Sequence, residues 1–219
     1  YKPKKGDKYD LLRMSLINLK NFKYTFYNNL TNKGENKPTK RILLNLQRDL
    51  QMKNIPNHIE CFDNSNLQGS YPSSACVVFK KGIPSKKDYR HFNIKTVKSP
   101  NDFASMEEVV RRRYLRLLNE KKQIPDLIII DGGKGQLSSA YKSLKSLNIH
   151  DKIKIIGIAK RLEEIYFVGE GLPIYIDKKS ESLRIIQRLR DEAHRFAIST
   201  HRAKRKKNLN KSLLDQIQG

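Results

Sequence analysis

Two aspartates occupy positions at which metal-dependent chemistry is common. Asp63 follows the predicted strand 58–62, and Asp131 follows the wholly apolar run 127–130. If these two strands are neighbours, the carboxylates meet at one end of a sheet, where they repel each other unless a proton or a cation lies between them. Oxygen ligands without a thiolate favour Mg²⁺ or Mn²⁺ over zinc. An Asp after a strand is also a common turn residue, so only the pair favours a metal site.

A histidine near the C-terminal end is a further candidate ligand. His194 borders the apolar face of the last predicted helix, 180–201, and Asp191 lies three residues before it on the same side. At this spacing Asp191 can hydrogen-bond the imidazole or itself supply an oxygen ligand. The spacing by itself favours a structural histidine at a helix interface.

A glycine-rich turn follows Asp131 and leads into a predicted helix. Residues 132–136 read Gly-Gly-Lys-Gly-Gln, which matches neither the G-x-x-x-x-G-K-[ST] pattern nor G-x-G-x-x-G. Such a turn presents backbone amides to an anion, and Lys134 adds a positive charge. We expect Gly133 and Lys134 to contact a nucleic-acid phosphate rather than ATP.

The charge of the chain points to a polyanionic partner. Its 219 residues include 45 Lys and Arg against 22 Asp and Glu, for a net charge of +23. Charge runs are often merely solvated, but an excess of this size favours nucleic acid, held through its phosphates without regard to sequence. The arginines expected to contact phosphates are Arg111, Arg112, Arg113, Arg195, Arg202 and Arg205.

The composition also excludes several classes of protein. The longest purely apolar run is 127–130, far short of the roughly 20 residues that a membrane span requires. Residues 1–6 lack the apolar core of a signal peptide. Cys61 and Cys76 are too few for a disulfide framework or a four-ligand zinc site. We expect a protein of a reducing compartment, the cytoplasm, without a membrane partner.

The elements that must position these residues change in character along the chain. Two basic amphipathic helices are predicted first, over 9–30 and from Thr39 to about residue 50. Short links then join three strands, which favours an antiparallel meander, and the remainder alternates helices with strands. The elements predicted after residue 57 are strands 58–62, 73–79 and 89–97, a helix from 99, strand 127–130, a helix from 134, strand 154–159, a hairpin over 164–176 and the helix 180–201.

This order predicts an α/β domain with a five-stranded mixed sheet and helices on both faces. It is the topology of the ribonuclease H-like fold, which hosts many functions. Within it, Ser99 and Pro100 would start a helix, with Asp102 three residues after the cap as in a capping box.

Five segments of the chain are distinctive enough to be recognised. They are 59–63 (Ile-Glu-Cys-Phe-Asp), 77–79 (Val-Val-Phe), 88–94 (Asp-Tyr-Arg-His-Phe-Asn-Ile), 131–137 (Asp-Gly-Gly-Lys-Gly-Gln-Leu) and 190–198 (Arg-Asp-Glu-Ala-His-Arg-Phe-Ala-Ile). They closely resemble the UvrC family, a component of the bacterial UvrABC nucleotide excision repair nuclease, in the right order over about residues 57–207. The resemblance implies a metal-dependent endonuclease that incises DNA 5′ to a lesion, with Asp63, Asp131 and His194 as its catalytic and metal-binding set.

The resemblance bears on two further residues and on the partners. Asp102 matches a functionally sensitive Asp of the family, although the capping box explains it equally well. Asn66 stands where the family usually has His, and its amide can still hydrogen-bond a phosphate. The implied partners are damaged double-stranded DNA and the other proteins of the UvrABC system, chiefly its helicase.

The resemblance also divides the chain into three parts. We expect a basic helical arm over 1–56, a ribonuclease H-like endonuclease domain over 57–201, and a basic linker over 202–219 that leads to a truncated helix-hairpin-helix module.

Two alternative functions compete with that of a nuclease. A ribonuclease H-like module that binds nucleic acid without cutting is compatible with the charge and the topology. A basic ribosome-associated protein explains the charge but not the paired carboxylates.

Overall fold

The computed structural model describes residues 37–65, 73–95, 101–159, 164–170 and 172–214, with scattered positions between 3 and 19. Of residues 37, 38, 65 and 200–214 only the backbone is described. The chain separates into two units, Tyr1–Lys40 and Arg41–Gly219. The predicted helix over 9–30 falls almost wholly outside the described residues, and the second unit contains the sheet.

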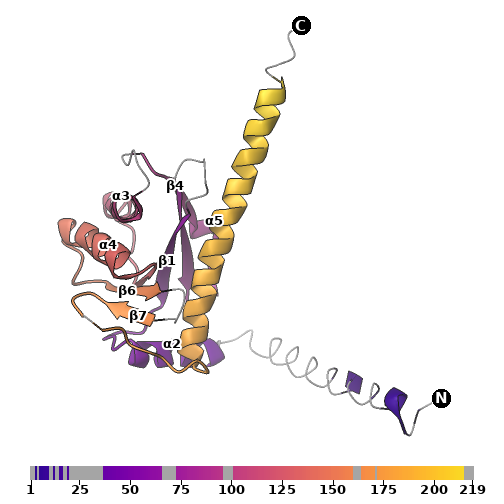
Figure 1. Cartoon of the computed structure of the whole chain (residues 1–219). Coiled ribbons are helices and arrows are strands. Elements are labelled where there is room, and N and C mark those ends of the chain that lie inside the picture. The colour runs from indigo at the N-terminus through magenta and orange to yellow at the C-terminus, as the bar shows by residue number, and fades with distance from the viewer. Residues whose placement is uncertain are drawn as a thin grey trace. The chain divides into compact units, whose positions relative to one another are not determined.

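A mixed sheet forms the centre of the second unit (Figure 1). Its strand order is β3-β2-β1-β5-β6-β7, and β4 pairs with the first half of β2. β1 is antiparallel to β2 but parallel to β5, which is in turn parallel to β6. The strands are β1 (His58–Ser65), β2 (Ser73–Lys80), β3 (Ile83–Pro84), β4 (Arg90–Asn93), β5 (Leu127–Asp131), β6 (Lys154–Ala159) and β7 (Glu164–Phe167).

The predicted α/β class and ribonuclease H-like arrangement are confirmed, but the described residues form seven strands rather than five. β3 has two residues, too few for any periodic pattern to reveal. β7 adds an antiparallel edge to β6, whereas its expected hairpin partner makes only an isolated bridge between Ile165 and Ile174. The predicted strand 89–97 is reduced to the four residues of β4.

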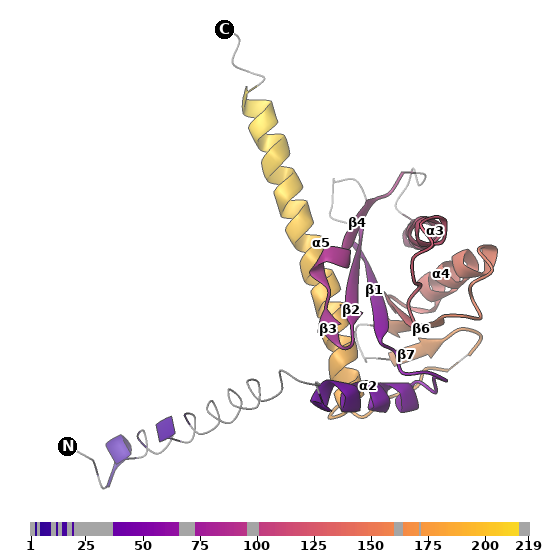
Figure 2. The same cartoon turned by 180° about the vertical axis from the view of Figure 1, so that it is seen from behind.

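Helices cover both faces of the sheet, as Figures 1 and 2 show from opposite sides. α3 (Asp102–Asn119) and α4 (Lys134–Ser146) pack on one face, and α5 (Glu181–Leu214) crosses the other. Alternation along β1 divides its side chains between them. Phe62 contacts the Tyr114 ring of α3, at 6.2 Å between centroids, whereas Asp63 faces α5. α2 (Lys37–Asp49) adds Leu43, Leu46 and its neighbour Leu50 to the core.

Several predicted helix boundaries are wrong, each for a local reason. α2 begins at Lys37, so Thr39 lies inside it and is not its N-cap. The N-cap of α3 is Asn101, whose side chain accepts hydrogen bonds from the amides of Phe103 and Ala104 at 3.1 Å. Asp102 is therefore the first helical residue and not the third residue of a capping box. α5 continues to Leu214 because no Gly or Pro interrupts 201–214.

No helix in the described part of the chain is long and apolar enough to cross a membrane.

Candidate active site at the carboxyl edge of the sheet

The carboxyl ends of β1 and β5 bring two aspartates together. Asp63 and Asp131 are direct partners in the parallel register of these strands, which lie about 4.8 Å apart. Both residues are buried, with 1% and 4% of their surface exposed. The two strands are central in the sheet, so each aspartate has paired strands on both sides. Two ionisable acids are therefore buried together at the carboxyl ends of neighbouring strands, in an otherwise strongly basic protein.

His194 approaches this edge from α5. Its Nδ1 lies 3.0 Å from Oδ2 of Asp63, within hydrogen-bond distance. Ala193 and Ala197, on either side of it, are fully buried and allow α5 to lie close to β1 and β2. The His194 side chain is 54% exposed, whereas that of Asp63 is 2% exposed. The ring therefore covers one aspartate and remains accessible from solvent.

The thiol of Cys61 lies on the same face of β1 as Asp63 and is excluded as a metal ligand. Cys61 is fully buried, two residues before Asp63 on the same face of β1. Burial raises the pKa of the Cys61 thiol well above its ordinary value, and the carboxylates of Asp131 and Asp63 raise it further. The thiol consequently stays protonated at neutral pH and is not a thiolate ligand.

The donor chemistry of this edge fits a hard divalent cation. A cation placed between the two buried carboxylates removes their mutual repulsion. Carboxylate oxygens with an imidazole nitrogen are ligands suited to Mg²⁺ or Mn²⁺. Within the described ranges, no three His, Cys, Asp or Glu side chains already surround a common point. The structure thus places Asp63 in contact with His194 and opposite Asp131 in the neighbouring strand. The three side chains do not yet converge on one point as the ligands of a bound ion would.

The two other acids proposed from the sequence lie differently. Asp191 forms an ion pair with Arg190, with 3.0 Å between Oδ1 and the guanidinium NH2, and the ring of His194 meets Asp63 instead. Asp102 is exposed at the start of α3. Its backbone oxygen accepts a hydrogen bond from Asn64 Nδ2 at 3.1 Å. That bond fixes the first turn of α3 to the end of β1, so Asp102 lies at the same edge of the sheet.

The glycine-rich turn forms the start of α4, beside Asp131. Gly133 is the N-cap, and no side chain of the described residues caps the helix there. Apart from its chain neighbours, no described atom lies within 4 Å of the position that a Cβ of Gly133 would take, so the turn has room for a ligand. Lys134 is exposed, with its Nζ 5.1 Å from the centroid of the Tyr166 ring on β7. This arrangement is compatible with the predicted phosphate contact.

An open groove with a volume of about 650 Å³ runs along α5 between Arg184 and Arg195. Arg184, Arg188 and Arg195 line it from one side of the helix, together with Asp191 and Glu192. Phe79 of β2 and Lys86 of the 3-10 turn 86–88 line it from the opposite side. The Arg188 guanidinium lies 5.6 Å from the centre of the Phe79 ring. The basic side chains suit the sugar–phosphate backbone of a nucleic acid.

The remaining residues predicted to bind nucleic acid divide into three groups. Arg195 lines the groove and donates from Nε to Glu192 at 2.7 Å. Arg202 and Arg205 lie on the backbone of α5, where side chains are not described. Asn66 lies outside the described residues.

The prediction of a phosphate contact is wrong for Arg113. This side chain is buried and donates from Nε and NH2 to Glu60, at 3.2 and 2.5 Å. Tyr114 also donates to Glu60, at 2.9 Å. Burial alone would raise the pKa of Glu60, but His58 and Arg113 outweigh it and lower that pKa to about 2. The signal was present in the sequence, because Arg113 lies seven residues after Met106 and three after Val110, on the apolar face of its helix.

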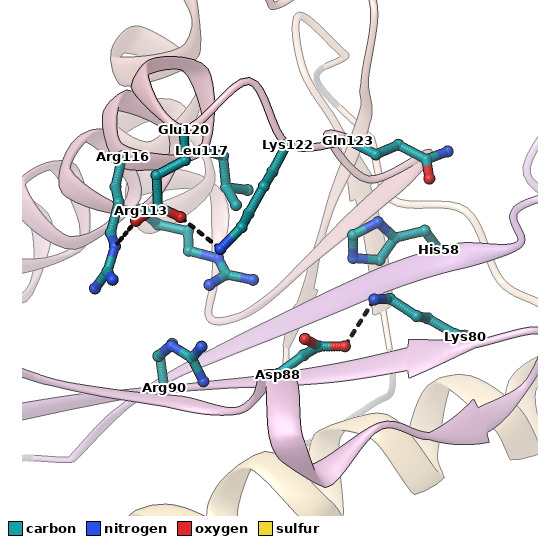
Figure 3. Close-up of a pocket in the computed structure, with 10 residues that line it drawn as sticks. All are labelled: His58, Lys80, Asp88, Arg90, Arg113, Arg116, Leu117, Glu120, Lys122 and Gln123. Atoms are coloured by element: carbon teal, nitrogen blue, oxygen red, sulfur yellow. Dashed lines mark hydrogen bonds and ion pairs between the residues drawn. The ribbon is translucent and has the colours of Figure 1, made fainter.

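A second, basic cavity of about 240 Å³ lies over this buried pair (Figure 3). It opens beside His58, at the start of β1, and so at the opposite end of that strand from Asp63. Its charged side chains are largely paired, Lys80 with Asp88 at 2.7 Å, and Arg116 and Lys122 with Glu120 at 2.6 and 2.7 Å. The first pair links β2 to the turn 86–88, and the other two lie at the C-terminal end of α3, all at a distance from the aspartates.

A mixed sheet of this order, with acids at the ends of its two central parallel strands and helices on both faces, defines a ribonuclease H-like domain. The chain belongs to the family of the UvrC RNase H endonuclease domain, whose model matches residues 47–198.

Curated relatives extend this similarity over nearly the whole chain. The UvrABC system protein C of Flavobacterium psychrophilum is 56% identical over 217 residues, 99% of this chain and 36% of the relative. That of Cytophaga hutchinsonii is 58% identical over 206 residues, 94% of this chain and 34% of the relative. The chain therefore spans little more than a third of the length of these relatives. A solved structure of Ciona intestinalis endonuclease V in complex with DNA overlaps 63% of this chain and 56% of its own at 21% identity, with a TM-score of 0.37, too low to support any argument.

Proposed function

We propose that this chain is the endonuclease part of a UvrC-type repair protein, and that it hydrolyses a DNA phosphodiester on the 5′ side of a lesion during nucleotide excision repair. The observation that carries the proposal is the pairing of Asp63 with Asp131 in adjacent parallel strands, both buried, with His194 at 3.0 Å from Asp63. The family supports the reaction class, because its matching domain is an endonuclease domain.

The reaction depends on Mg²⁺ or Mn²⁺ held by Asp63 and Asp131, with His194 as a third ligand. When bound, such an ion lowers the pKa of a water molecule and stabilises negative charge on the leaving oxygen. The two aspartates supply the charge that selects a divalent cation in a protein with a net charge of +23. Asp102 and Asp191 are weaker candidates, because Asp191 is paired with Arg190 and Asp102 is exposed at the start of α3.

His194 has a second task that its contact with Asp63 supports. With Nδ1 engaged by the Asp63 carboxylate, the ring is held in one orientation and Nε2 points away from that bond. In this orientation Nε2 faces away from Asp63 and can exchange a proton with the phosphodiester. For His194 to share an ion with Asp63, the ion must take the place of the hydrogen bond between Nδ1 and the carboxylate. The exposure of the ring lets DNA reach it.

DNA contacts come from both sides of the two aspartates. Gly133 and Lys134 offer amides and a positive charge to a phosphate at the start of α4. Arg195 and the other arginines of the α5 groove hold the backbone as it leaves the site. Arg202, Arg205 and Asn66 complete the proposed set of phosphate contacts.

The substrate is damaged double-stranded DNA, presented by the other proteins of the UvrABC system, chiefly its helicase. We place the protein in the cytoplasm, and the free thiols of Cys61 and Cys76 agree with a reducing compartment. Of the predicted arm over 1–56, residues 41–56 belong to the unit that contains the sheet, to whose core Leu43, Leu46 and Leu50 contribute. Residues 1–40 and the segment 202–219 serve as flanking basic regions of the endonuclease domain.

A nicking assay tests this function. Damaged duplex is incubated with the chain and the partner proteins, in Mg²⁺, in Mn²⁺ and in chelator. We expect 5′ incision only with a divalent ion. DNA binding in all three conditions with incision in none would instead favour a module that binds without cutting.

A further inference from the structure

A large apolar side chain lies exposed at the same edge as the two aspartates. Phe103, the second residue of α3, is 55% exposed. Its position is fixed, because Asn64 Nδ2 donates to the backbone oxygen of Asp102 and Asn64 directly follows Asp63. Single exposed apolar residues are ordinary on a protein surface. Phe103 differs from such residues because it is held next to the candidate active site.

The ring of Phe103 is seated against the first turn of α4. A Cβ on Gly135 would lie 2.4 Å from Cε1 of Phe103 and 2.8 Å from Cζ, so any side chain at 135 would displace the ring. Glycine is among the least favourable residues within a helix. Its presence here lets an aromatic ring from α3 lie close against α4, four residues after Asp131. One side of the ring is thus supported by backbone, and the exposed remainder faces solvent.

The same turn of α4 has an aromatic ring on another side. The Nζ of Lys134 lies 5.1 Å from the centre of the Tyr166 ring. Aromatic rings interleaved with positive charge are how proteins hold unpaired nucleic-acid strands, because bases stack on the rings while cations meet the phosphates. The net charge of +23 makes a nucleic acid the matching occupant, rather than an apolar peptide.

We propose that Phe103 stacks on an unpaired base of the DNA strand next to the phosphate that is cut. This inference rests on the proposed function and deepens it, since it requires the strand at the site to have at least one base out of its helical stack. Phe103 is then a positioning residue: it holds the nucleotide so that the neighbouring phosphate meets Asp63 and Asp131.

A photocrosslinking experiment tests the stacking. A duplex with a central bubble carries 5-iododeoxyuridine at its unpaired positions and is bound to the chain in chelator at low salt. Near-ultraviolet light joins iodouracil to an aromatic ring that it contacts, and mass spectrometry locates the adduct. We expect an adduct at Phe103 with the bubble duplex and none with the fully paired duplex of the same sequence.

Affinity for the same two duplexes gives a second readout. Phe103→Leu keeps an apolar side chain over Gly135 but removes the ring, and it should weaken binding of the bubble duplex roughly 5- to 100-fold while changing binding of the paired duplex little. Gly135→Ala should displace the ring and lose the adduct although Phe103 is still present. Leu118→Ala, at a side chain 38% exposed on the same helix, is the matched control and should change neither readout.

Bound bubble duplex without an adduct at Phe103 overturns the proposal. So does equal affinity of wild type and Phe103→Leu for that duplex, which is also the result expected if a partner protein covers the ring. Both measurements are made in chelator and do not depend on incision. Failure to cut DNA would therefore refute the proposed function without changing the crosslink or the affinity at Phe103. Failure to crosslink at Phe103 would refute the stacking without affecting the test of incision.

Discussion

Replacement of Arg113 by Leu should destabilise the protein severely, because it removes the guanidinium from the buried, charged Glu60. The carboxylate then retains His58 and Tyr114 as partners among the described residues. Glu60 is fully buried and accepts two hydrogen bonds from Arg113. Removal of one partner of a buried ion pair costs about 3–5 kcal/mol. We expect Arg113→Leu to lower the free energy of unfolding by that amount, measured by urea denaturation at pH 7.

A second substitution makes the cause testable. Glu60→Gln removes the charge but keeps an acceptor for the Tyr114 hydroxyl, which lies 2.9 Å from the carboxylate. The double variant Glu60→Gln/Arg113→Leu should therefore be more stable than Arg113→Leu alone, by about 1–3 kcal/mol. Arg111→Leu, at an exposed neighbour in the same triplet, is the matched control and should change stability by less than about 0.5 kcal/mol. A loss below about 1 kcal/mol for Arg113→Leu, or no recovery in the double variant, would refute this account of the interior.

Three further predictions concern pH, metal and salt. The pKa of Glu60 falls from 4.5 to about 2 in the folded state, so its ion pair stabilises the protein fully above pH 4.5. About 3 kcal/mol of that stability should be lost as the pH falls toward 2. Acid titration of the Glu60→Gln variant should lack this loss. Mg²⁺ or Mn²⁺ should raise the melting temperature of the wild type and not that of Asp63→Asn, and equal shifts in both proteins would remove Asp63 from the metal site. Deletion of residues 202–211 should flatten the slope of log affinity for duplex DNA against log salt concentration, because six basic residues are removed; an unchanged slope would show that this segment does not contact DNA.

The fold was largely predictable because its central elements carry strong patterns. The apolar run of β5 predicts a buried strand, and the periodic apolar positions of α3 and α4 predict helices. The order of these elements along the chain then predicts the topology of the sheet. β3 could not be found, since two residues carry no period. The N-cap at Asn101 was missed because Ser99 and Pro100 offer an equally regular start for α3, and local sequence does not decide between them.

The candidate site was predictable only in part. Strand ends are visible in sequence, so the pairing of Asp63 and Asp131 could be anticipated from topology. The partner of His194 could not, because spacing within α5 suggests Asp191 whereas the tertiary packing of α5 on β1 brings the ring to Asp63. Phe103 was missed for a similar reason, since its contact with Gly135 joins two helices.

The most direct test of the account is the rate of 5′ incision by Asp131→Asn in an otherwise complete repair assembly. This change keeps the shape of the side chain and removes its negative charge. We expect incision to fall by several orders of magnitude, because metal activation of water supplies several kcal/mol and each ~1.4 kcal/mol is tenfold in rate, while DNA binding by the same folded protein is retained. A folded Asp131→Asn protein that incises at the normal rate would contradict the assignment of this edge as the active site.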